Sequence, residues 1–269
     1  MARDRAPGRA RGWLRRVVVA TPVVVALGVT PLVQRPGGDD ARQEDLLAQG
    51  RRLYQTGCSS CHGPDGRGVE TDDGSTRGPT LANAGEAAAY YYLSTGRMPL
   101  ANTEEQPVRK EPAYDDEEIA ALVAYVGTLG EGPRVPNVDV DGADVAAGGE
   151  LYRDNCQACH SASGSGGALN YGRAAPRLSD AQPAEIGSAV RVGPGQMPVF
   201  GPEVIGADEL DDLAAYVVYL RDPADPGGIP IGRTGPIPEG FVAWLVGVPA
   251  LLGVVAWIGS RLPIRRRRA

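Results

Sequence analysis

Histidine, cysteine and phenylalanine are scarce in this chain. Its 269 residues include two His, four Cys and two Phe. Every Cys lies in a Cys-x-x-Cys pair, at 58–61 or at 156–159, so none is left for a separate disulfide framework. Each of the two His, His62 and His160, directly follows one of these pairs. No His is therefore spare for other chemistry.

Basic residues are scarce in the middle of the chain. Residues 38–236 hold 15 basic and 31 acidic side chains, whereas residues 1–37 hold seven Arg and one acid. Residues 237–269 hold five Arg and one acid. Nucleic-acid binding requires a basic surface, so we predict no nucleic-acid partner. An acidic body between basic ends is typical of a soluble region whose ends touch a membrane.

The first of two apolar runs, Val17–Val33, follows six Arg and contains two Pro. At 17 residues it is shorter than the roughly 20 residues that a membrane-spanning helix needs. Its place near the N-terminus is typical of a secretory signal, and its residues leave open whether it is cleaved or retained. We therefore predict that residues 1–38 are a signal peptide or an N-terminal membrane anchor.

The second apolar run, Phe241–Leu262, has no charged residue among its first 20 and carries Trp244 and Trp257 near its ends. Its length and its aromatic ends predict a transmembrane helix over residues 239–262. Four consecutive Arg follow, which places the tail, residues 263–269, in the cytoplasm. The acidic body is then expected on the extracytoplasmic side of the cell membrane.

The chain contains an internal repeat. Gly50–Gly68 and Gly148–Gly166 share a Gly, a Leu-Tyr pair, both Cys and the His, at a constant offset of 98. Further matches follow in the same order, "TGRMP" with "PGQMP" and then "EEIAALVAYVGTL" with "DELDDLAAYVVYL". This order predicts two copies of one domain. The predicted ranges are 39–131 and 148–223 for the domains, 132–147 for the linker between them and 224–238 for a second linker.

Within each copy we expect a helix that leads into the Cys pair, a Gly-rich loop, a short middle helix, a loop with a Met, and a closing helix. Gly50 and Gly148 either allow close helix packing or occupy ordinary interior positions. An insert, Leu100–Tyr114, exists only in the first copy and is either a docking surface or a solvated loop. Domains this small with so few bulky side chains bury little apolar surface, so a bound group is expected to complete each core.

Cys-x-x-Cys-His admits three interpretations. Zinc ribbons place two Cys pairs about 15 to 20 residues apart on one metal, whereas these pairs are 98 apart. No alternation of strands and helices, as in a thioredoxin-like dithiol, surrounds either pair. Attachment of haem c uses every residue, because two thiols and an imidazole lie on one helical turn. We predict two covalently bound haem c groups, with thioethers to Cys58, Cys61, Cys156 and Cys159.

Two methionines besides the initiator are the predicted sixth ligands of the iron. Met98 and Met197 lie 36 and 37 residues after the His of their copy, each inside Gly-x-Met-Pro. One Met is more often a core residue than a ligand, but two in the same local sequence favour ligation. The predicted axial pairs are His62 with Met98 and His160 with Met197. Because both irons would be closed, we predict electron transfer and no catalytic residue.

The sequence resembles the dihaem cytochrome c subunits of actinobacterial cytochrome bcc complexes. The stretches that carry this resemblance are "TGRMPLANTEEQPVRKEP", "GGALNYGRAAPRL", "GPGQMPVF" and "GPIPEGFVAWLVG". The resemblance covers about residues 48–262. It implies a mainly α chain of two tandem class I cytochrome c domains followed by a transmembrane helix.

The resemblance also implies a role in aerobic respiration. In this family menaquinol is oxidised at a cytochrome b subunit, and a Rieske iron–sulfur protein passes electrons to the first haem, here at Cys58. The second haem, here at Cys156, delivers them to the copper-bearing subunit of a terminal haem–copper oxidase. The chain is then the electron-transfer subunit of a quinol–cytochrome c reductase, with no substrate chemistry at its own haems. The residues leave two alternatives open: a stand-alone membrane-tethered dihaem donor to another oxidase or reductase, and a haem subunit of a peroxidase or dehydrogenase.

Overall fold

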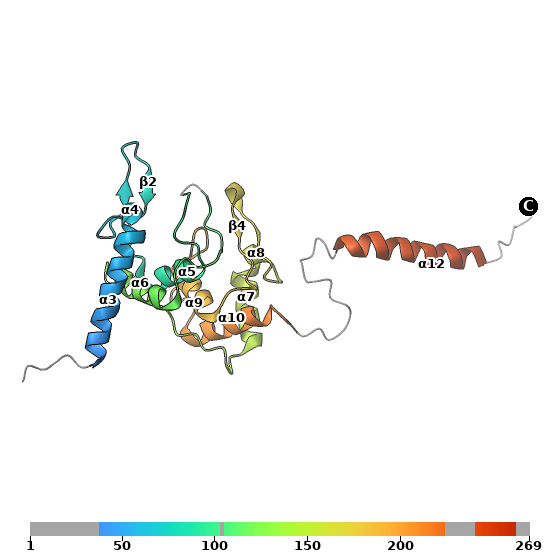
Figure 1. Cartoon of the computed structure of the whole chain (residues 1–269). Coiled ribbons are helices and arrows are strands. Elements are labelled where there is room, and N and C mark those ends of the chain that lie inside the picture. The colour runs from blue at the N-terminus through green and yellow to red at the C-terminus, as the bar shows by residue number, and fades with distance from the viewer. Residues whose placement is uncertain (1–37, 103–104, 224–239, 262–269) are drawn as a thin grey trace, which may run out of the picture. The chain divides into compact units, whose positions relative to one another are not determined.

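The computed structural model describes residues 38–102, 105–223 and 240–261 (Figure 1). The predicted signal or anchor run, the second linker at 224–238 and the basic tail at 263–269 lie outside these residues. Helices dominate the described secondary structure, which confirms the predicted mainly α class. Two cytochrome-like copies and one apolar helix near the C-terminus follow one another in the predicted order.

The two copies use corresponding helices in the same sequence. The first copy contains α3 (Gly38–Gly57), α4 (Ser59–His62), α5 (Gly85–Ser94) and α6 (Asp116–Gly127). The second contains α7 (Val145–Asn155), α8 (Gln157–His160), α9 (Pro183–Val192) and α10 (Ala207–Tyr219). Each set is a helix into the Cys pair, a one-turn helix, a short middle helix and a closing helix, as the repeat predicts.

Each predicted Gly-rich loop also contains a short antiparallel hairpin. In the first copy β1 (Val69–Glu70) pairs with β2 (Thr76–Gly78). In the second, β3 (Gly167–Ala168) pairs with β4 (Ala174–Ala175) around the turn η1 (Asn170–Gly172), with Gly167 opposite Ala175 and Ala168 opposite Ala174. Strands of two or three residues are too short to show an alternating pattern, so the sequence predicts only a loop.

The closing helices begin with acidic residues that cap them. The side chain of Asp115 accepts a hydrogen bond from the backbone N–H of Glu118 at 2.9 Å, and the Glu118 carboxylate accepts one from the N–H of Asp115 at 3.2 Å. At α10 the Glu209 carboxylate accepts from the N–H of Gly206 at 2.7 Å. These contacts satisfy N–H groups that the first helical turn leaves unpaired. The acidic clusters are therefore helix starts.

Two glycines allow the leading and closing helices to touch. A Cβ atom built on Gly50 would overlap the backbone carbonyl of Ala121 in α6, and one built on Gly148 would overlap that of Asp212 in α10. Backbone atoms cannot move aside as a side chain can, so only Gly fits these two positions. The close-packing alternative is therefore correct for both residues.

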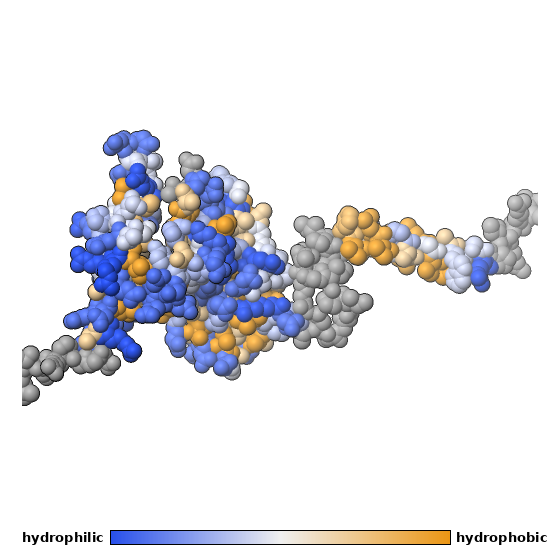
Figure 2. Space-filling model, viewed as in Figure 1, coloured by the Kyte–Doolittle hydropathy of each residue, from blue (hydrophilic) through white to orange (hydrophobic). Residues whose placement is uncertain are grey.

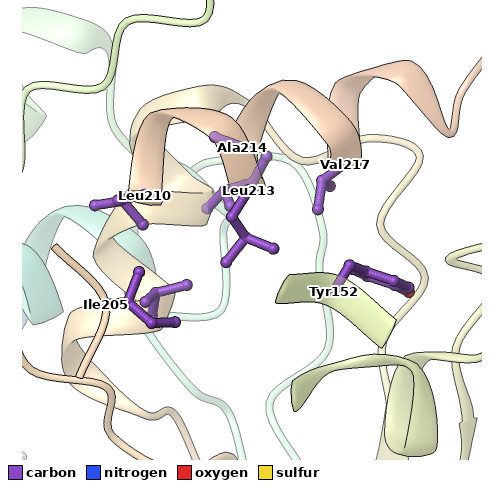
Figure 3. Packing of buried hydrophobic residues seen from close by; sticks show 8 residues of the cluster. Tyr152, Ile205, Leu210, Leu213, Ala214 and Val217 are labelled. Carbon is purple, nitrogen blue, oxygen red and sulfur yellow. The ribbon is translucent and has the colours of Figure 1, made fainter. Parts of the chain in front are cut away.

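Each copy has its own small core. The core of the second copy is shown in Figure 3 and consists of Tyr152, Ile186, Val190, Ile205, Leu210, Leu213, Ala214 and Val217. That of the first copy consists of Tyr54, Leu93, Ile119, Leu122 and Val126. Neither cluster contains a Phe or a Trp. Cores this small support the expectation that a bound group adds apolar surface.

The linker between the copies has no helix or strand over residues 130–142, yet its backbone is anchored. The Pro133 carbonyl accepts a hydrogen bond from the N–H of Ala87 in α5 at 2.9 Å. Further along, the N–H of Asp144 donates to the carboxylate of Asp212 in α10 at 2.7 Å. Val138 packs against the core of the second copy. The segment therefore lies along both copies, although its composition predicts only a linker.

One described helix is long and apolar enough to cross a membrane. It runs over Gly240–Arg261 and includes a π-helical turn, η2 (Ala243–Gly247), followed by α12 (Val248–Arg261). Figure 2 shows apolar residues along much of this helix, in contrast to the hydrophilic surface of the two copies. Such a helix suggests a membrane anchor. At its end the Arg261 guanidinium lies 4.4 Å from the ring centre of Trp257.

Candidate haem-binding sites

In both copies the Cys-x-x-Cys-His sequence forms one helical turn set off by a bend in the chain. The bend falls at Cys58, where φ is −121°, and at Cys156, where φ is −118°. The Cys58 carbonyl accepts hydrogen bonds from the N–H groups of Cys61 at 3.1 Å and His62 at 2.9 Å. The Cys156 carbonyl makes the same two bonds, at 3.2 and 2.9 Å. The turn therefore carries two sulfur atoms and one imidazole, the donor set that haem c attachment requires.

Both histidine rings are oriented by a backbone carbonyl that follows the Gly-rich loop. Nδ1 of His62 lies 2.8 Å from the Pro79 oxygen, and Nδ1 of His160 lies 3.0 Å from the Pro176 oxygen. A carbonyl oxygen only accepts hydrogen bonds, so Nδ1 carries the proton and Nε2 keeps a free lone pair for a metal. Burial also lowers the pKa of His160, which favours the neutral, metal-binding form.

Burial makes the first thiol of each pair a poor redox nucleophile. Burial raises the pKa of Cys58 to about 11, and burial does the same for Cys156. Reactive dithiols instead need a lowered thiol pKa. The raised pKa values therefore disfavour the dithiol interpretation and are compatible with thioether formation.

A buried tyrosine supports the residue that follows each histidine. The Tyr54 hydroxyl donates to the Gly63 carbonyl at 2.6 Å, and the Tyr152 hydroxyl donates to the Ser161 carbonyl at 2.7 Å. Both tyrosines have no exposed surface. Burial raises the pKa of Tyr54 to about 12, so its hydroxyl stays protonated as a donor. Both tyrosines belong to the Leu-Tyr pair that the two copies share, but the sequence does not reveal their hydrogen bonds.

Both predicted methionine ligands lie in loops directly after the middle helices, and both are half-buried. Met98 and Cys58 pack against the core of the first copy, and Met197 and Cys156 pack against that of the second. The N–H of Met98 donates to the Tyr92 carbonyl at 3.0 Å. Each copy thus brings its Cys and its Met to the same core, although they are far apart in sequence.

The first copy contains one buried cation beside its predicted ligand. Arg97 is 7% exposed, and its guanidinium carbon lies 4.9 Å from the ring centre of Tyr91. Within the part of the chain that the structure describes, its Nη1 atom has no hydrogen-bond partner. A buried, unpaired cationic N–H group is costly, so it indicates an acceptor that the protein itself does not supply. Haem carries propionate carboxylates that suit this role, and the residues of the site therefore fit the group.

Sequence reasoning missed Arg97, Pro79 and Pro176 as parts of the sites. A signal was present for Arg97, because the repeated Gly-x-Met-Pro sequence has Arg in the first copy and Gln196 in the second. The prolines are also repeated, but a backbone carbonyl carries no side-chain signature.

Comparisons with known proteins agree with this organisation. The family model for cytochrome c matches residues 47–130, and the model for subunit III of cbb3-type cytochrome c oxidase matches residues 143–217. A cytochrome bc1 complex cytochrome c subunit from Mycobacterium bovis is 38% identical over 94% of this chain and 95% of its own length. The corresponding subunit from Corynebacterium efficiens is 37% identical over 88% of this chain and 84% of its own. The cbb3-type oxidase subunit FixP of Sinorhizobium medicae is 24% identical over 66% of the chain and 62% of its own.

Two cytochrome c domains, each with a Cys-x-x-Cys-His turn, define a c-type cytochrome, and such domains imply covalently bound haem c. The near full-length similarity goes further. The chain belongs to the family of cytochrome c subunits of the cytochrome bc1 complex. It is an electron-transfer subunit of a quinol–cytochrome c reductase complex and associates with the other subunits of that complex.

Proposed function

We propose that the chain holds two haem c groups with His/Met ligation and transfers electrons within a menaquinol-oxidising complex. Electrons enter from a Rieske iron–sulfur protein at the first copy and leave from the second copy to the copper centre of a haem–copper oxidase. Bound haem c supplies a one-electron iron couple at each site. The repeated orientation of His62 and His160 by a backbone carbonyl carries this proposal.

The residues of each turn have separate tasks. The four Cys would form the thioethers, and Nε2 of each His would bind the iron. Met98 and Met197, in the loops after α5 and α9, would supply a sulfur ligand at their own site. His/Met ligation gives the high reduction potential that an electron carrier after a quinol requires. The tyrosine hydroxyls hold the chain after each His in place, so the imidazoles are oriented before the group binds.

Arg97 distinguishes the first site from the second. We assign its unpaired Nη1 atom to a propionate carboxylate of the first group, since it is buried beside Met98. Gln196 is the corresponding residue of the second copy, and it is exposed and uncharged. A buried positive charge favours the reduced iron, so the chain itself makes the two sites electrostatically different.

The membrane helix and the charge distribution support the location that we propose. The helix Gly240–Arg261 anchors the chain, and the Arg-rich tail stays in the cytoplasm by the positive-inside rule. The acidic copies then lie outside, next to the cytochrome b and Rieske subunits.

Purification of the complex tests the proposed partners. An affinity tag at the C-terminus would be used to isolate the chain from its own membranes in a mild detergent, with an unrelated tagged single-span protein as control. We expect mass spectrometry to identify cytochrome b, a Rieske protein and a copper-bearing oxidase subunit only with this chain. Recovery of an oxidase or reductase without cytochrome b and Rieske subunits would instead support a stand-alone donor.

A further inference from the structure

The insert of the first copy contacts the second copy. Within Leu100–Tyr114 we name Gln106–Lys110 the strap. The side-chain amide of Gln106 makes two hydrogen bonds to the backbone of Ala174 in β4. Its Nε2 donates to the Ala174 carbonyl at 2.8 Å, and its Oε1 accepts from the Ala174 N–H at 2.9 Å. Both backbone groups of Ala174 are thereby satisfied by one side chain.

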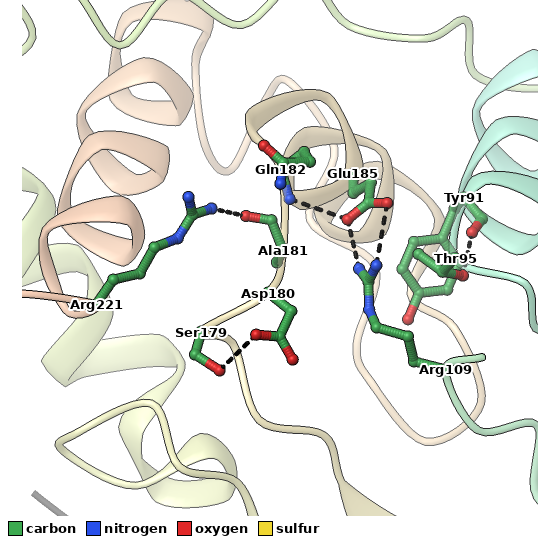
Figure 4. Close-up of polar contacts among 9 residues, drawn as sticks. All are labelled: Tyr91, Thr95, Arg109, Ser179, Asp180, Ala181, Gln182, Glu185 and Arg221. Carbon is green, nitrogen blue, oxygen red and sulfur yellow. Dashed lines mark hydrogen bonds and ion pairs between the residues drawn. The ribbon is translucent and has the colours of Figure 1, made fainter. Parts of the chain in front are cut away.

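A second contact of the strap is an ion pair whose carboxylate is buried and whose guanidinium is partly exposed. Figure 4 shows the guanidinium of Arg109 facing the carboxylate of Glu185 in α9. Nη1 donates to Oε1 at 3.4 Å, and Nη2 contacts Oε2. The Glu185 side chain is 5% exposed and that of Arg109 is 33% exposed. A carboxylate this deeply buried needs a partner, so Arg109 matters more here than in a surface ion pair.

The far end of the strap is fixed to the loop that carries Met98. The N–H of Lys110 donates to the Thr95 carbonyl at 3.2 Å, and its Nζ donates to the Pro99 carbonyl at 2.8 Å. A Cβ atom on Gly96 would overlap the Lys110 carbonyl, so the two backbones lie in direct contact. The strap therefore connects the Met98 loop of the first copy to α9 and β4 of the second.

The strap adds to two other contacts between the copies. The middle helices α5 and α9 pack against each other, with Ala87 and Ala88 of α5 buried. The linker is anchored to α5 through Pro133, and Gly187 of α9 leaves space for Pro136 and Val138 of the same linker. Packing between apolar helix faces alone allows one copy to slide along the other. An ion pair and the hydrogen bonds of a side-chain amide have directional geometry and therefore fix one relative position.

From these contacts we propose that the strap locks the two cytochrome domains into one rigid unit, with Arg109 and Gln106 as positioning residues. The inference deepens the proposed function and rests on it in one respect. If both sites hold haem, the lock keeps the separation and orientation of the two haems constant. Electrons then pass between the domains without a prior movement of one domain toward the other. In this proposal the insert is a docking surface, and what docks on it is the second copy of the same chain rather than another protein.

Hydrogen–deuterium exchange on the full-length, haem-loaded chain in detergent tests the lock. The variants are Arg109→Gln, Gln106→Ala, and Arg109→Gln combined with Glu185→Gln, which removes the ion pair without leaving a buried charge. Arg67→Gln is the matched control, because it deletes an exposed Arg that pairs with Asp65 inside the first copy. Arg109→Lys keeps the charge but not the two-point contact.

We expect exchange in the strap, in β4 and in α9 to become at least several-fold faster in the three variants, with α10 unchanged. Arg67→Gln should match the unaltered protein, and Arg109→Lys should fall between it and Arg109→Gln. Faster exchange in the same segments of Arg67→Gln, or unchanged exchange in all strap variants, would overturn the proposal. All variants and the control are compared in the same haem-loaded state and without complex partners, so this failure differs from failure of the proposed function.

A kinetic measurement on the same variants reports the consequence for electron transfer. After flash reduction of one haem, the rate of equilibration between the two is expected to fall several-fold in the double variant and to stay constant in Arg67→Gln. The visible spectrum of each haem should not change, because no ligand is altered. An unaltered equilibration rate in a variant with faster exchange would show that the lock does not serve electron transfer.

Discussion

Residues at corresponding positions make the same hydrogen bonds around each Cys-x-x-Cys-His turn. Tyr54 and Tyr152 hold the next segment, while the carbonyls of Pro79 and Pro176 orient the rings. These hydrogen bonds are present in both copies although the copies differ in sequence. This is expected if each histidine ring must be held in one tautomer. Arg97 breaks this equivalence, since the second copy has Gln196 in its place.

Replacement of Arg97 by Gln is expected to lower the reduction potential of the first haem only. The charge removed is buried, so the change should be on the order of 50 mV, for a unit charge in an effective dielectric constant of about 20. Potentiometric titration followed by visible absorption measures both potentials. Gln196→Arg is the control, because residue 196 is exposed and solvent screens its charge. Equal shifts in both variants would contradict the assignment of Arg97.

At the scale of residues, the sequence predicts which side chains belong to the sites but not which backbone groups they contact. The scarcity of His and Met leaves few candidates for an iron ligand, so the eight site residues follow from counting and spacing. Pro79 and Pro176 act through their carbonyl oxygens, which any residue possesses, and their role depends on where the hairpins place them. The assignment of the eight residues as haem ligands stays a prediction.

The helices show how far a repeat specifies local structure. The order of the helices follows from the alignment of the two copies, whereas the alignment leaves two roles open for Gly50 and Gly148, and the structure shows that they are contact positions. The hairpins do not, because their strands are two or three residues long. The sequence also does not predict the contacts of the strap. Its partners Ala174 and Glu185 belong to the other copy, and the strap itself has no counterpart in the repeat. Long-range contacts of a non-repeated segment leave no pattern to detect.

Gly148→Ala is expected to destabilise the second copy. Its new methyl group would meet the backbone carbonyl of Asp212, so α7 must move away from α10 at a cost of about 1–3 kcal/mol. Gly149→Ala is the matched control one residue away, where the new atom meets side chains that can shift, Tyr216 at 2.9 Å and Arg153 at 3.2 Å. Thermal unfolding of the haem-loaded protein should show a clearly larger decrease in Tm for Gly148→Ala. A smaller decrease than for Gly149→Ala would contradict close packing of these helices.

At the scale of the whole molecule, charge and hydropathy divide the chain into an acidic body and an apolar helix. The described helix Gly240–Arg261 lies in the predicted span and is long and apolar enough to cross a membrane. Charge counts alone predict the side of the membrane, and that assignment stays a prediction, as do the domain limits. The contacts between the copies have no signature in composition, because they depend on the relative placement of two folded units.

The proposed electron-transfer path depends on a methionine sulfur atom bound to each iron. X-ray absorption at the iron edge of the purified, haem-loaded chain counts the sulfur neighbours of iron directly. We predict one sulfur per iron in the unaltered protein, half of that average in Met98→Leu or Met197→Leu, and none in the double variant. A sulfur count near zero in the unaltered protein, or one that neither substitution changes, would contradict His/Met ligation and with it the proposed electron-transfer path.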